Sequence, residues 1–297
     1  MSRQIIDMRC RPAYLHDFFG KTPGSPDFET VRWLNRRVGT RGDDRHFTRS
    51  ATPEGFLGEI AEARLARAVV VARHTPSQHL PNDDIAEIVA LDPDRIVGIG
   101  AVDPILQGEA AALAEITRAV RVLNLKGIDL EPGFGNPPRH PDDQAYFPIY
   151  ELAESLDVPI FLMSGPTTPN PRYNDPSGIA AIAQSFPRLK IGVFHGSWPN
   201  VHAILGLAFR YETINLIPDM YLFQPGSDLY VEAANGWLAD QLLFGSSYPF
   251  RPIKQSIDDA LALGLREDVL DRFFHDNAAR LLGFPKAGGT HQAGDAR

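Results

Sequence analysis

The sequence predicts an α/β protein with a (β/α)8 barrel fold, and three observations carry this prediction. Eight short apolar runs alternate along the chain with segments of helical periodicity, which is the pattern of parallel βαβ units. The chain has 297 residues, enough for eight such units in one domain. No Gly-x-Gly-x-x-Gly motif follows the first run, so an open dinucleotide-binding sheet has little support.

Each predicted strand is a short apolar, often β-branched run that ends at polar, Gly or Pro residues. A helical pattern follows each of them. The eight strands are expected at Ile5–Met8, Ala68–Ala72, Ile96–Val102, Gly127–Leu130, Pro159–Met163, a run that ends at His195, Leu216–Leu222 and Leu242–Gly245.

A long excursion over residues 12–66 separates the first two strands. It is rich in Gly, Pro, Arg and aromatic residues and contains two helical patterns. A barrel carries such an insertion as a cap or lid over its mouth, or as a dimer contact. We expect one barrel domain over residues 1–285 and a disordered tail over residues 286–297, which are rich in Gly, Ala, Thr, His and Gln.

The composition is that of an ordinary globular protein, with 43% hydrophobic and 22% charged residues. The net charge of −8 argues against nucleic acid and anionic membranes as partners. No run is long enough for a transmembrane helix, and the N-terminus lacks the apolar core of a signal peptide. The single cysteine, Cys10, excludes an internal disulfide framework. These features predict a cytoplasmic protein.

Charged residues gather where the predicted strands end, which is the edge at which barrels of this kind carry out chemistry. Arg9 and Arg11 are two residues apart, so both should point into the mouth, with Asp7 facing the same way and Cys10 facing outward. Two buried guanidiniums require anionic partners. These partners are either internal carboxylates or a substrate carboxylate or phosphate.

Asp129 and Glu131, also two apart, end the fourth strand. They either divide general acid and base work between them or neutralise the arginines, with Asp219 as a further internal partner. His195 is the natural proton shuttle, because its ordinary pKa lies near neutrality. A core histidine bonded to a backbone group is the alternative.

Other residues at the strand ends complete the candidate site. The candidate substrate-binding residues are Arg9, Arg11, Arg73, His74, Met163, Ser164, Trp198, Asp219, Tyr221, Ser247 and Tyr248. The aromatic members suit an aromatic-sized pocket, although each alone also fits plain packing.

Placed on a barrel, six segments resemble the amidohydrolase superfamily, in particular its amidohydrolase-2 branch of decarboxylases and hydrolases. They are Ile-Ile-Asp at 5–7, Leu-Lys-Gly-Ile-Asp-Leu at 125–130, Val-Pro-Ile at 158–160, Val-Phe-His-Gly at 193–196, Phe-Gly-Ser-Ser-Tyr-Pro at 244–249 and Asn-Ala-Ala-Arg-Leu-Leu-Gly at 277–283. The resemblance spans nearly the whole chain and implies a (β/α)8 barrel and a homodimer or higher assembly.

The resemblance also implies a metal site, but most of the ligand positions are changed. The family's first-strand His-x-His aligns with Arg9 and Arg11, its fifth-strand His with Met163 and its eighth-strand Asp with Ser247. Only His195 matches. A guanidinium has no lone pair to offer a metal, and a thioether suits copper(I) better than zinc or manganese. We therefore expect no metal cofactor, the alternative being a divalent metal at a shifted site near His195, Asp129, Glu131 and His74.

The sequence thus predicts an enzyme that hydrolyses a small carboxylated substrate, of aromatic or lactone type, without a metal. His195 would handle the proton, Arg9 and Arg11 would anchor the anion, and Asp129 or Glu131 would supply or orient a base. Decarboxylation is an alternative reaction. A catalytically inactive barrel that binds a metabolite or a protein is the alternative class.

Overall fold

Seven parallel strands form the frame of the protein, and they follow the order in which they occur along the chain. The computed structural model describes residues 3–39 and 44–284, so the predicted tail over 286–297 lies outside the described residues. The sheet runs in the order β1-β2-β5-β6-β7-β8-β9. Its strands are β1 Ile6–Cys10, β2 Arg67–Val71, β5 Ile96–Ala101, β6 Ile128–Leu130, β7 Ile160–Met163, β8 Ile191–Phe194 and β9 Ile214–Ile217.

The segment around Leu242 takes the place of the eighth strand between β9 and β1. Leu242 makes a parallel bridge to Leu216, and Tyr248 makes one to Cys10. The backbone N–H of Met8 donates to the carbonyl of Phe244 at 3.1 Å. The segment hydrogen-bonds on both sides, so the sheet closes into the predicted barrel, although this stretch is too irregular to count as a strand.

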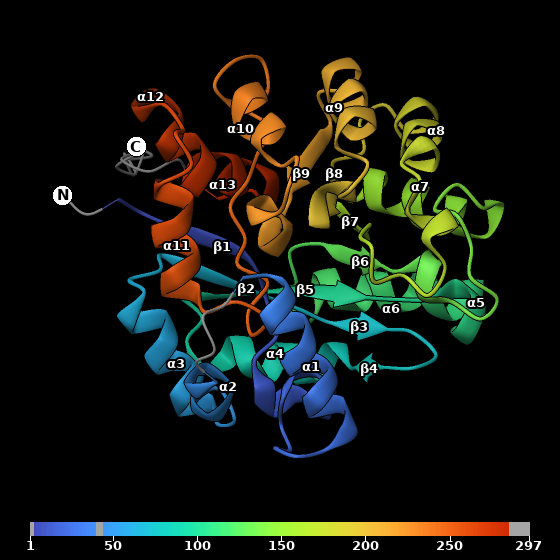
Figure 1. The fold of residues 1–297 in the computed structure, drawn as a ribbon. Helices are drawn as coiled ribbons and strands as arrows, with labels where there is room; N and C mark the ends of the chain where they lie inside the picture. Colours follow the sequence, from blue (N-terminus) through green and yellow to red (C-terminus); the bar gives the residue numbers. More distant parts are fainter. Residues whose placement is uncertain (1–2, 40–43, 285–297) are drawn as a thin grey trace, which may run out of the picture.

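Helices surround the barrel on its outside, as Figure 1 shows. They are α1 Pro26–Arg37, α2 Arg45–Arg49, α3 Pro53–Glu62, α4 Asn82–Leu91, α5 Pro104–Gln107, α6 Glu109–Arg121, α7 Phe147–Ser155, α8 Ser177–Ser185, α9 Val201–Arg210, α10 Asp228–Ala234, α11 Ile253–Leu261, α12 Glu267–Asp271 and α13 Asn277–Leu282. No helix within the described residues is both long and apolar enough to cross a membrane.

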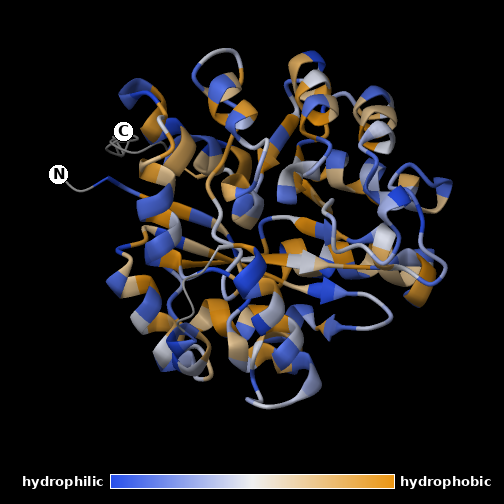
Figure 2. Ribbon diagram, viewed as in Figure 1, coloured by the Kyte–Doolittle hydropathy of each residue, from blue (hydrophilic) through white to orange (hydrophobic). Residues whose placement is uncertain are grey.

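Alternation along the strands separates two apolar layers. Val69 and Val71 of β2 pack into an inner cluster, whereas Ala68 and Val70 belong to the outer cluster under the helices. The hydropathy colouring in Figure 2 shows the same division, with apolar strands inside and mixed helices outside. Burying each large apolar side chain contributes about 1.5–3 kcal/mol, so both layers hold the barrel together.

The inside of the barrel holds two stacked phenyl rings. Phe161 and Phe194 lie with their centroids 5.0 Å apart at an interplanar angle of 18°. Space for Phe161 comes from glycines: a methyl group at Gly192 would lie 2.4 Å from its ring, and one at Gly127 would lie 2.7 Å away. The stack forms the floor beneath the mouth.

The excursion after β1 contains α1, α2 and α3, drawn in blue in Figure 1. Two one-turn 3-10 helices, η1 Ala13–Leu15 and η2 Asp17–Phe19, connect β1 to α1. The helix α1 begins after Ser25, whose Oγ accepts from the N–H of Phe28 at 3.1 Å. A third apolar cluster joins the excursion to Met220, Tyr221 and Phe250.

The predicted strand over Leu216–Leu222 is wrong in its extent. The strand β9 ends at Ile217, and Pro218 leads into the 3-10 helix η7, Asp219–Phe223. Asp219 has φ of 45°, and its Oδ1 accepts from the N–H of Met220 at 2.6 Å. Because of this turn, Asp219 lies outside the sheet.

The glycines beneath Phe161 give a stability prediction. The Gly192→Ala variant should lose about 1–3 kcal/mol of unfolding free energy, because its methyl group would collide with the Phe161 ring, which stacks on Phe194. In the matched Gly206→Ala variant on α9, nothing lies within 4 Å of the new methyl group, so better helix propensity should raise stability by up to about 1 kcal/mol. Denaturant unfolding measures both, and equal effects of the two variants would contradict the packing described.

Candidate active site

A bulge in β1 turns Arg9 and Arg11 toward the mouth. Asp7 pairs with Ala68 and Cys10 with Val70, so Met8 and Arg9 together lie opposite one residue of β2. Met8 packs in the inner cluster and Cys10 in the outer one. Arg9 and Arg11 thus share the interior face, as the sequence indicates.

The expectation that Asp7 faces the same way as Arg9 is wrong, because the bulge changes the alternation between them. Asp7 Oδ1 accepts from the backbone N–H groups of Arg9, at 3.1 Å, and Ser246, at 2.9 Å. Burial raises its pKa to about 6, although these hydrogen bonds act to lower it. Asp7 therefore ties β1 to the segment that closes the barrel.

Arg11 and Arg73 share the carboxylates of β6. Arg11 Nη2 lies 3.1 Å from both Asp129 Oδ2 and Glu131 Oε1. Arg73, in the hairpin β3 Arg73–His74 and β4 His79–Leu80, places Nη2 2.5 Å from Glu131 Oε2. All four side chains are at most 4% exposed, so each charge depends on its partners.

The two carboxylates of this network titrate differently. Burial and the neighbouring Glu131 charge raise the pKa of Asp129 to about 7. Burial acts to raise the pKa of Glu131 as well, but Arg73 and Arg11 outweigh it and lower that pKa to about 2. Glu131 is therefore the permanent anion of the cluster.

His195 is oriented by Asp219. Nδ1 of His195 lies 2.8 Å from Asp219 Oδ1, and its backbone N–H donates to Asp219 Oδ2 at 3.2 Å. Burial lowers the pKa of His195, with Asp219 opposing this shift and Arg9 adding to it. The ring is thus neutral at pH 7 with Nδ1 protonated, and Nε2 has no partner among the described residues.

Arg9 lies beside this pair. Its guanidinium is 4.5 Å above the Phe194 ring centroid, its Nε is 3.8 Å from Asp219 Oδ2, and its Nη2 donates to Met163 Sδ at 3.4 Å. Nη1 is buried without a hydrogen-bond partner. Burial and the Arg11 charge lower the pKa of Arg9 to about 10, so it stays a cation at neutral pH.

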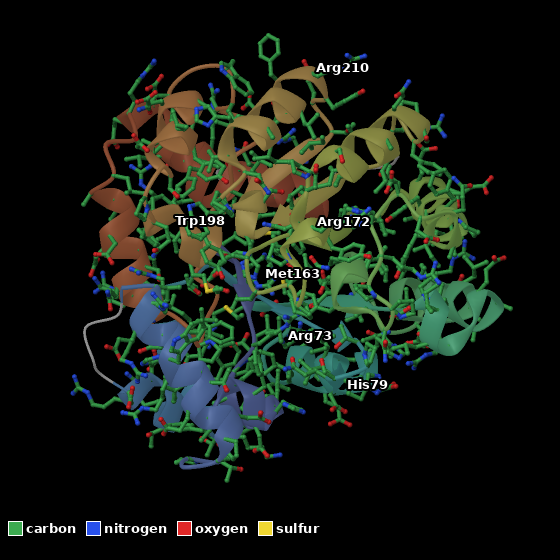
Figure 3. All side chains as sticks on the ribbon, turned by 45° about the vertical axis from the view of Figure 1, so that its right-hand side comes forward. Arg73, His79, Met163, Arg172, Trp198 and Arg210 are labelled. Atoms are coloured by element: carbon green, nitrogen blue, oxygen red, sulfur yellow. The ribbon has the colours of Figure 1, made fainter. Side chains whose placement is uncertain are left out.

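These side chains border a cavity of about 420 Å³ at the mouth. Its polar wall is formed mainly by Arg9, Arg11, Arg73 and His195. The remaining wall is largely apolar, and its residues are Phe18, Phe19, Thr30, Trp33, Leu34, Ser77, Gln78, Phe134, Met163, Pro166, Thr167, Pro169, Met220 and Phe250. Figure 3 shows Met163 and Arg73 near the centre of the molecule and His79 farther out on the hairpin.

Of the predicted site residues, the arginines, Met163 and His195 border this cavity. Asp129, Glu131 and Asp219 lie behind them as partners of the cations and of the histidine. Trp198 and Tyr221 stack on each other at 5.2 Å, with Tyr221 edge-on to His195. Tyr221 therefore packs against the ring of His195, and Trp198 packs against Tyr221.

The other four predicted residues are not among those that border the cavity. Ser164 bonds Asn174 and Ser197. The hydroxyl of Tyr248 donates to the carbonyl of His46 at 2.8 Å. His74 stacks on His79. Ser247 has a buried Oγ that lacks a partner.

Sequence reasoning missed Phe134 and Phe250 in the aromatic wall. Phe134 follows β6 in the 3-10 helix η3, Pro132–Phe134, and Phe250 follows the closing segment. Both positions come directly after strand ends, which is the signal that could have found them. Phe18, Phe19 and Trp33 come from the excursion, which the sequence predicts as a cap, a lid or a dimer contact, and all three border the cavity.

The residues at the family's ligand positions do not fit a divalent metal. Arg9 and Arg11 offer cations instead of lone pairs, and Met163 accepts a hydrogen bond from Arg9. Ser247 is neutral. Across residues 3–39 and 44–284, no group of three or more His, Cys, Asp or Glu side chains is arranged to hold a metal ion.

Fold and site together define a (β/α)8 barrel with a histidine–aspartate pair and an arginine-rich mouth. The chain belongs to the Amidohydrolase family, of the amidohydrolase-2 branch, whose profile matches residues 6–284. This confirms the resemblance seen in the sequence.

Three comparisons place the chain among known proteins. It is similar to an uncharacterized TIM-barrel protein from Bordetella bronchiseptica, with 29% identity over 94% of this chain and 98% of that one, at a TM-score of 0.86. A dihydroxybenzoic acid decarboxylase from Polaromonas, solved with bound manganese and 2-nitroresorcinol, shares the fold at 19% identity, with a TM-score of 0.64 over 95% of this chain and 97% of that one.

A third match is short. A 2-amino-3-carboxymuconate-6-semialdehyde decarboxylase of Dictyostelium discoideum is 32% identical over 81 residues, which is 27% of this chain and 21% of that protein. The matched part thus spans about a fifth of the relative's length. It supports the family assignment without carrying the relative's activity over.

The shared Glu131 carboxylate gives a second stability prediction. The Glu131→Gln variant should lose about 3–5 kcal/mol, because it leaves two buried guanidiniums short of a counter-charge. The control Asp157→Asn removes an exposed ion pair with Lys190 and should cost at most about 1 kcal/mol. Equal losses in denaturant unfolding would show that the buried network contributes no more than a surface pair.

Proposed function

We propose that this protein is a metal-independent hydrolase that cleaves an ester or lactone bond in a small, planar, carboxylated substrate. One observation carries the proposal: His195, which is paired with Asp219, borders an aromatic cavity beside Arg9, and Arg9 has an unpaired N–H. A base, a cation and a flat apolar wall at one mouth are the parts that such a reaction needs.

His195 acts as the base. Because Nδ1–H donates to Asp219, the lone pair of Nε2 can accept a proton from a water molecule. The hydroxide that forms attacks the acyl carbon, and the bond to the leaving oxygen then breaks. The proton held by His195 passes to that oxygen, so the histidine is neutral again at the end of the turnover.

Asp219 has two effects in this scheme. It fixes the ring orientation and tautomer through the Nδ1 contact, and its negative charge stabilises the imidazolium that forms during the reaction. Its third acceptor contact, from the N–H of Met220, holds the carboxylate in place. We therefore assign Asp219 a positioning role, whereas the sequence offers it both as a substrate-binding residue and as an internal partner of the arginines.

Arg9 is the proposed anion anchor. It lies within reach of the pair formed by His195 and Asp219, and it presents an unpaired, buried N–H group. A carboxylate or a developing oxyanion is the natural acceptor for such a donor. Arg11 is committed to Asp129, Glu131 and two backbone carbonyls, so it supports the site instead of anchoring the substrate.

The contacts of Asp129 and Glu131 with the arginines argue against the acid or base role that the sequence offers for these two carboxylates. Glu131 is held between two guanidiniums and has a lowered pKa, which makes it a poor base. Asp129 Oδ2 contacts Arg11. We therefore assign these carboxylates to charge balance and leave His195 as the base.

The excursion completes the pocket as a fixed cap. Phe18, Phe19, Trp33 and Leu34 border the cavity, and Phe18 and Phe19 both meet Phe250 edge-on at 6.0 and 6.1 Å. Aromatic walls on two sides favour a ring-shaped substrate and exclude bulk water from the reacting bond, apart from the water molecule that His195 activates.

Decarboxylation is the second candidate, and the decarboxylases among the similar proteins favour it. In that reaction a protonated His195 would deliver a proton to the ring carbon that loses its carboxylate. Release of carbon dioxide separates this reaction from hydrolysis, which yields a new carboxylate and keeps every carbon atom.

The pH dependence of turnover tests the role of His195. For the wild type we expect kcat/KM to fall below a pKa that lies under the usual histidine value of 6.5. Asp219→Asn should lower kcat/KM about 10²–10⁴-fold and move this acidic limb to lower pH, because Asp219 raises the pKa of His195. Arg9→Met should move the limb to higher pH, because Arg9 lowers that pKa.

Two further variants serve as controls for this test. His195→Ala should abolish turnover while the fold survives, and full activity in that variant would refute the assignment. Asp228→Asn, at the exposed start of α10, should leave both the rate and the pH profile unchanged. An acidic limb that stays in place in both Asp219→Asn and Arg9→Met would show that another group titrates.

A further inference from the structure

The outer part of the cavity carries an aromatic side chain that the proposed reaction does not use. Trp33 of α1 borders the cavity, yet it is 47% exposed. His195 and Arg9 border the same cavity and are at most 3% exposed. The reacting groups therefore lie at the floor of the cavity, and the half-exposed indole lies at its rim, where the cavity meets the solvent.

The helix α1 presents Trp33 to the cavity. Thr30, Trp33 and Leu34 all border the cavity, and residues three and four apart lie on one face of a helix. Leu34 belongs to the apolar cluster that joins the excursion to the barrel, so packing anchors this face of α1. The guanidinium of Arg37 lies 5.3 Å from the centroid of the Trp33 ring, where a cation–π interaction favours this orientation of the indole.

The rim offers a planar ligand group little else to pack on. Besides Thr30 and Trp33, the exposed residues that border the cavity are Ser77, in the loop between β3 and β4, and Thr167 and Pro169, in the loop after β7. Among these described rim residues Trp33 is the only aromatic one, and none of them is charged. The indole is thus the surface of the rim on which a second ring would stack.

The cavity has room beyond a single carboxylated ring. Its volume of about 420 Å³ lies within the range of about 300–1,000 Å³ in which pockets enclose drug-sized ligands, and a single ring with one carboxylate is smaller than such a ligand. A carboxylate on Arg9 would place that ring at the floor beside His195. A substrate that extends from there to the rim would bury further apolar surface, which favours binding.

We propose that Trp33 forms an outer aromatic subsite and that the substrate carries a second planar, apolar group attached to its carboxylated ring. The carboxylate and the scissile bond lie at the floor with Arg9 and His195, and the second group stacks on the indole at the rim. This inference rests on the proposed function, because it names a further part of the substrate of the same site.

Calorimetric binding of simple probes tests the subsite without any turnover. The probes are benzoate, biphenyl-3-carboxylate and biphenyl-4-carboxylate, titrated into the wild-type chain. At least one biphenyl acid should bind about 10- to 100-fold more tightly than benzoate, because its second ring is buried against the indole. Equal Kd values for the three probes, or absence of binding by both biphenyl acids, would overturn the proposal.

Tryptophan variants assign this advantage to its residue. Trp33→Ala should remove most of the advantage of the preferred biphenyl acid over benzoate, and Trp33→Phe, which keeps a ring, should retain part of it. The matched control is Trp237→Ala, because Trp237 is 46% exposed, contacts Phe209 and is not among the residues that border this cavity. It should keep the full advantage. An advantage that survives undiminished in Trp33→Ala would overturn the subsite.

Tryptophan fluorescence provides a second readout that does not require a Trp33 variant to fold. The chain has three tryptophans, Trp33, Trp198 and Trp237, and of these Trp33 borders the cavity. In the Trp237→Ala chain, the preferred biphenyl acid should shift the emission to shorter wavelength, because it covers a half-exposed indole. Benzoate at saturation should cause a smaller shift. Equal shifts with both probes, or no shift with either, would contradict stacking on Trp33.

The outcomes separate the subsite from the proposed reaction. If the advantage of the biphenyl acid depends on Trp33 but His195→Ala retains full turnover, the proposed reaction fails and the subsite stands. If the advantage is absent while His195 controls turnover, the subsite fails and the reaction stands.

Discussion

The structure of the mouth depends on the Glu131 carboxylate, which Arg11 and Arg73 share. Without it, the barrel would bury two cations with too little negative charge, at a cost of several kcal/mol for each ion. Glu131, which follows β6, forms ion pairs with Arg11, which follows β1, and with Arg73 in the hairpin after β2. These ion pairs join the three segments at the mouth of the barrel.

The site can be understood as a family barrel whose metal-ligand positions carry a different chemistry. Where the family has histidines on the first strand, this chain has two cations, and the neutral Met163 accepts a hydrogen bond from one of them. His195 is retained but is paired with Asp219. A divalent ion would meet repulsion from Arg9 there, whereas an anionic substrate would be attracted.

The sequence predicted the barrel and its family because strand–helix alternation and strand-end motifs are local signals. It also predicted that Arg9, Arg11, Arg73, Met163 and His195 would line the mouth. It did not reveal the bulge in β1, because nothing in the local pattern shows that Met8 and Arg9 lie opposite a single residue. For the same reason, the orientation of Asp7 was misjudged.

The sequence also could not predict which side chains pair with each other across the barrel. Sequence spacing left open whether Asp129 and Glu131 were catalytic or balanced the arginines, since only the tertiary distances to Arg11 decide this. The turn at Pro218 withdrew Asp219 from the sheet and placed it against His195. The sequence also left open whether the excursion forms a cap or a dimer contact, and only the folded chain shows that its aromatic residues border the cavity.

The metal content of the purified, untagged protein tests the account most directly. Elemental mass spectrometry, before and after incubation with manganese or zinc followed by dialysis, measures the metal bound per chain. We predict far less than one equivalent in both samples, because the ligand positions are occupied by cations and neutral groups. Close to one equivalent that resists dialysis would mean that the barrel has rebuilt a metal site around His195, and it would contradict the metal-free mechanism.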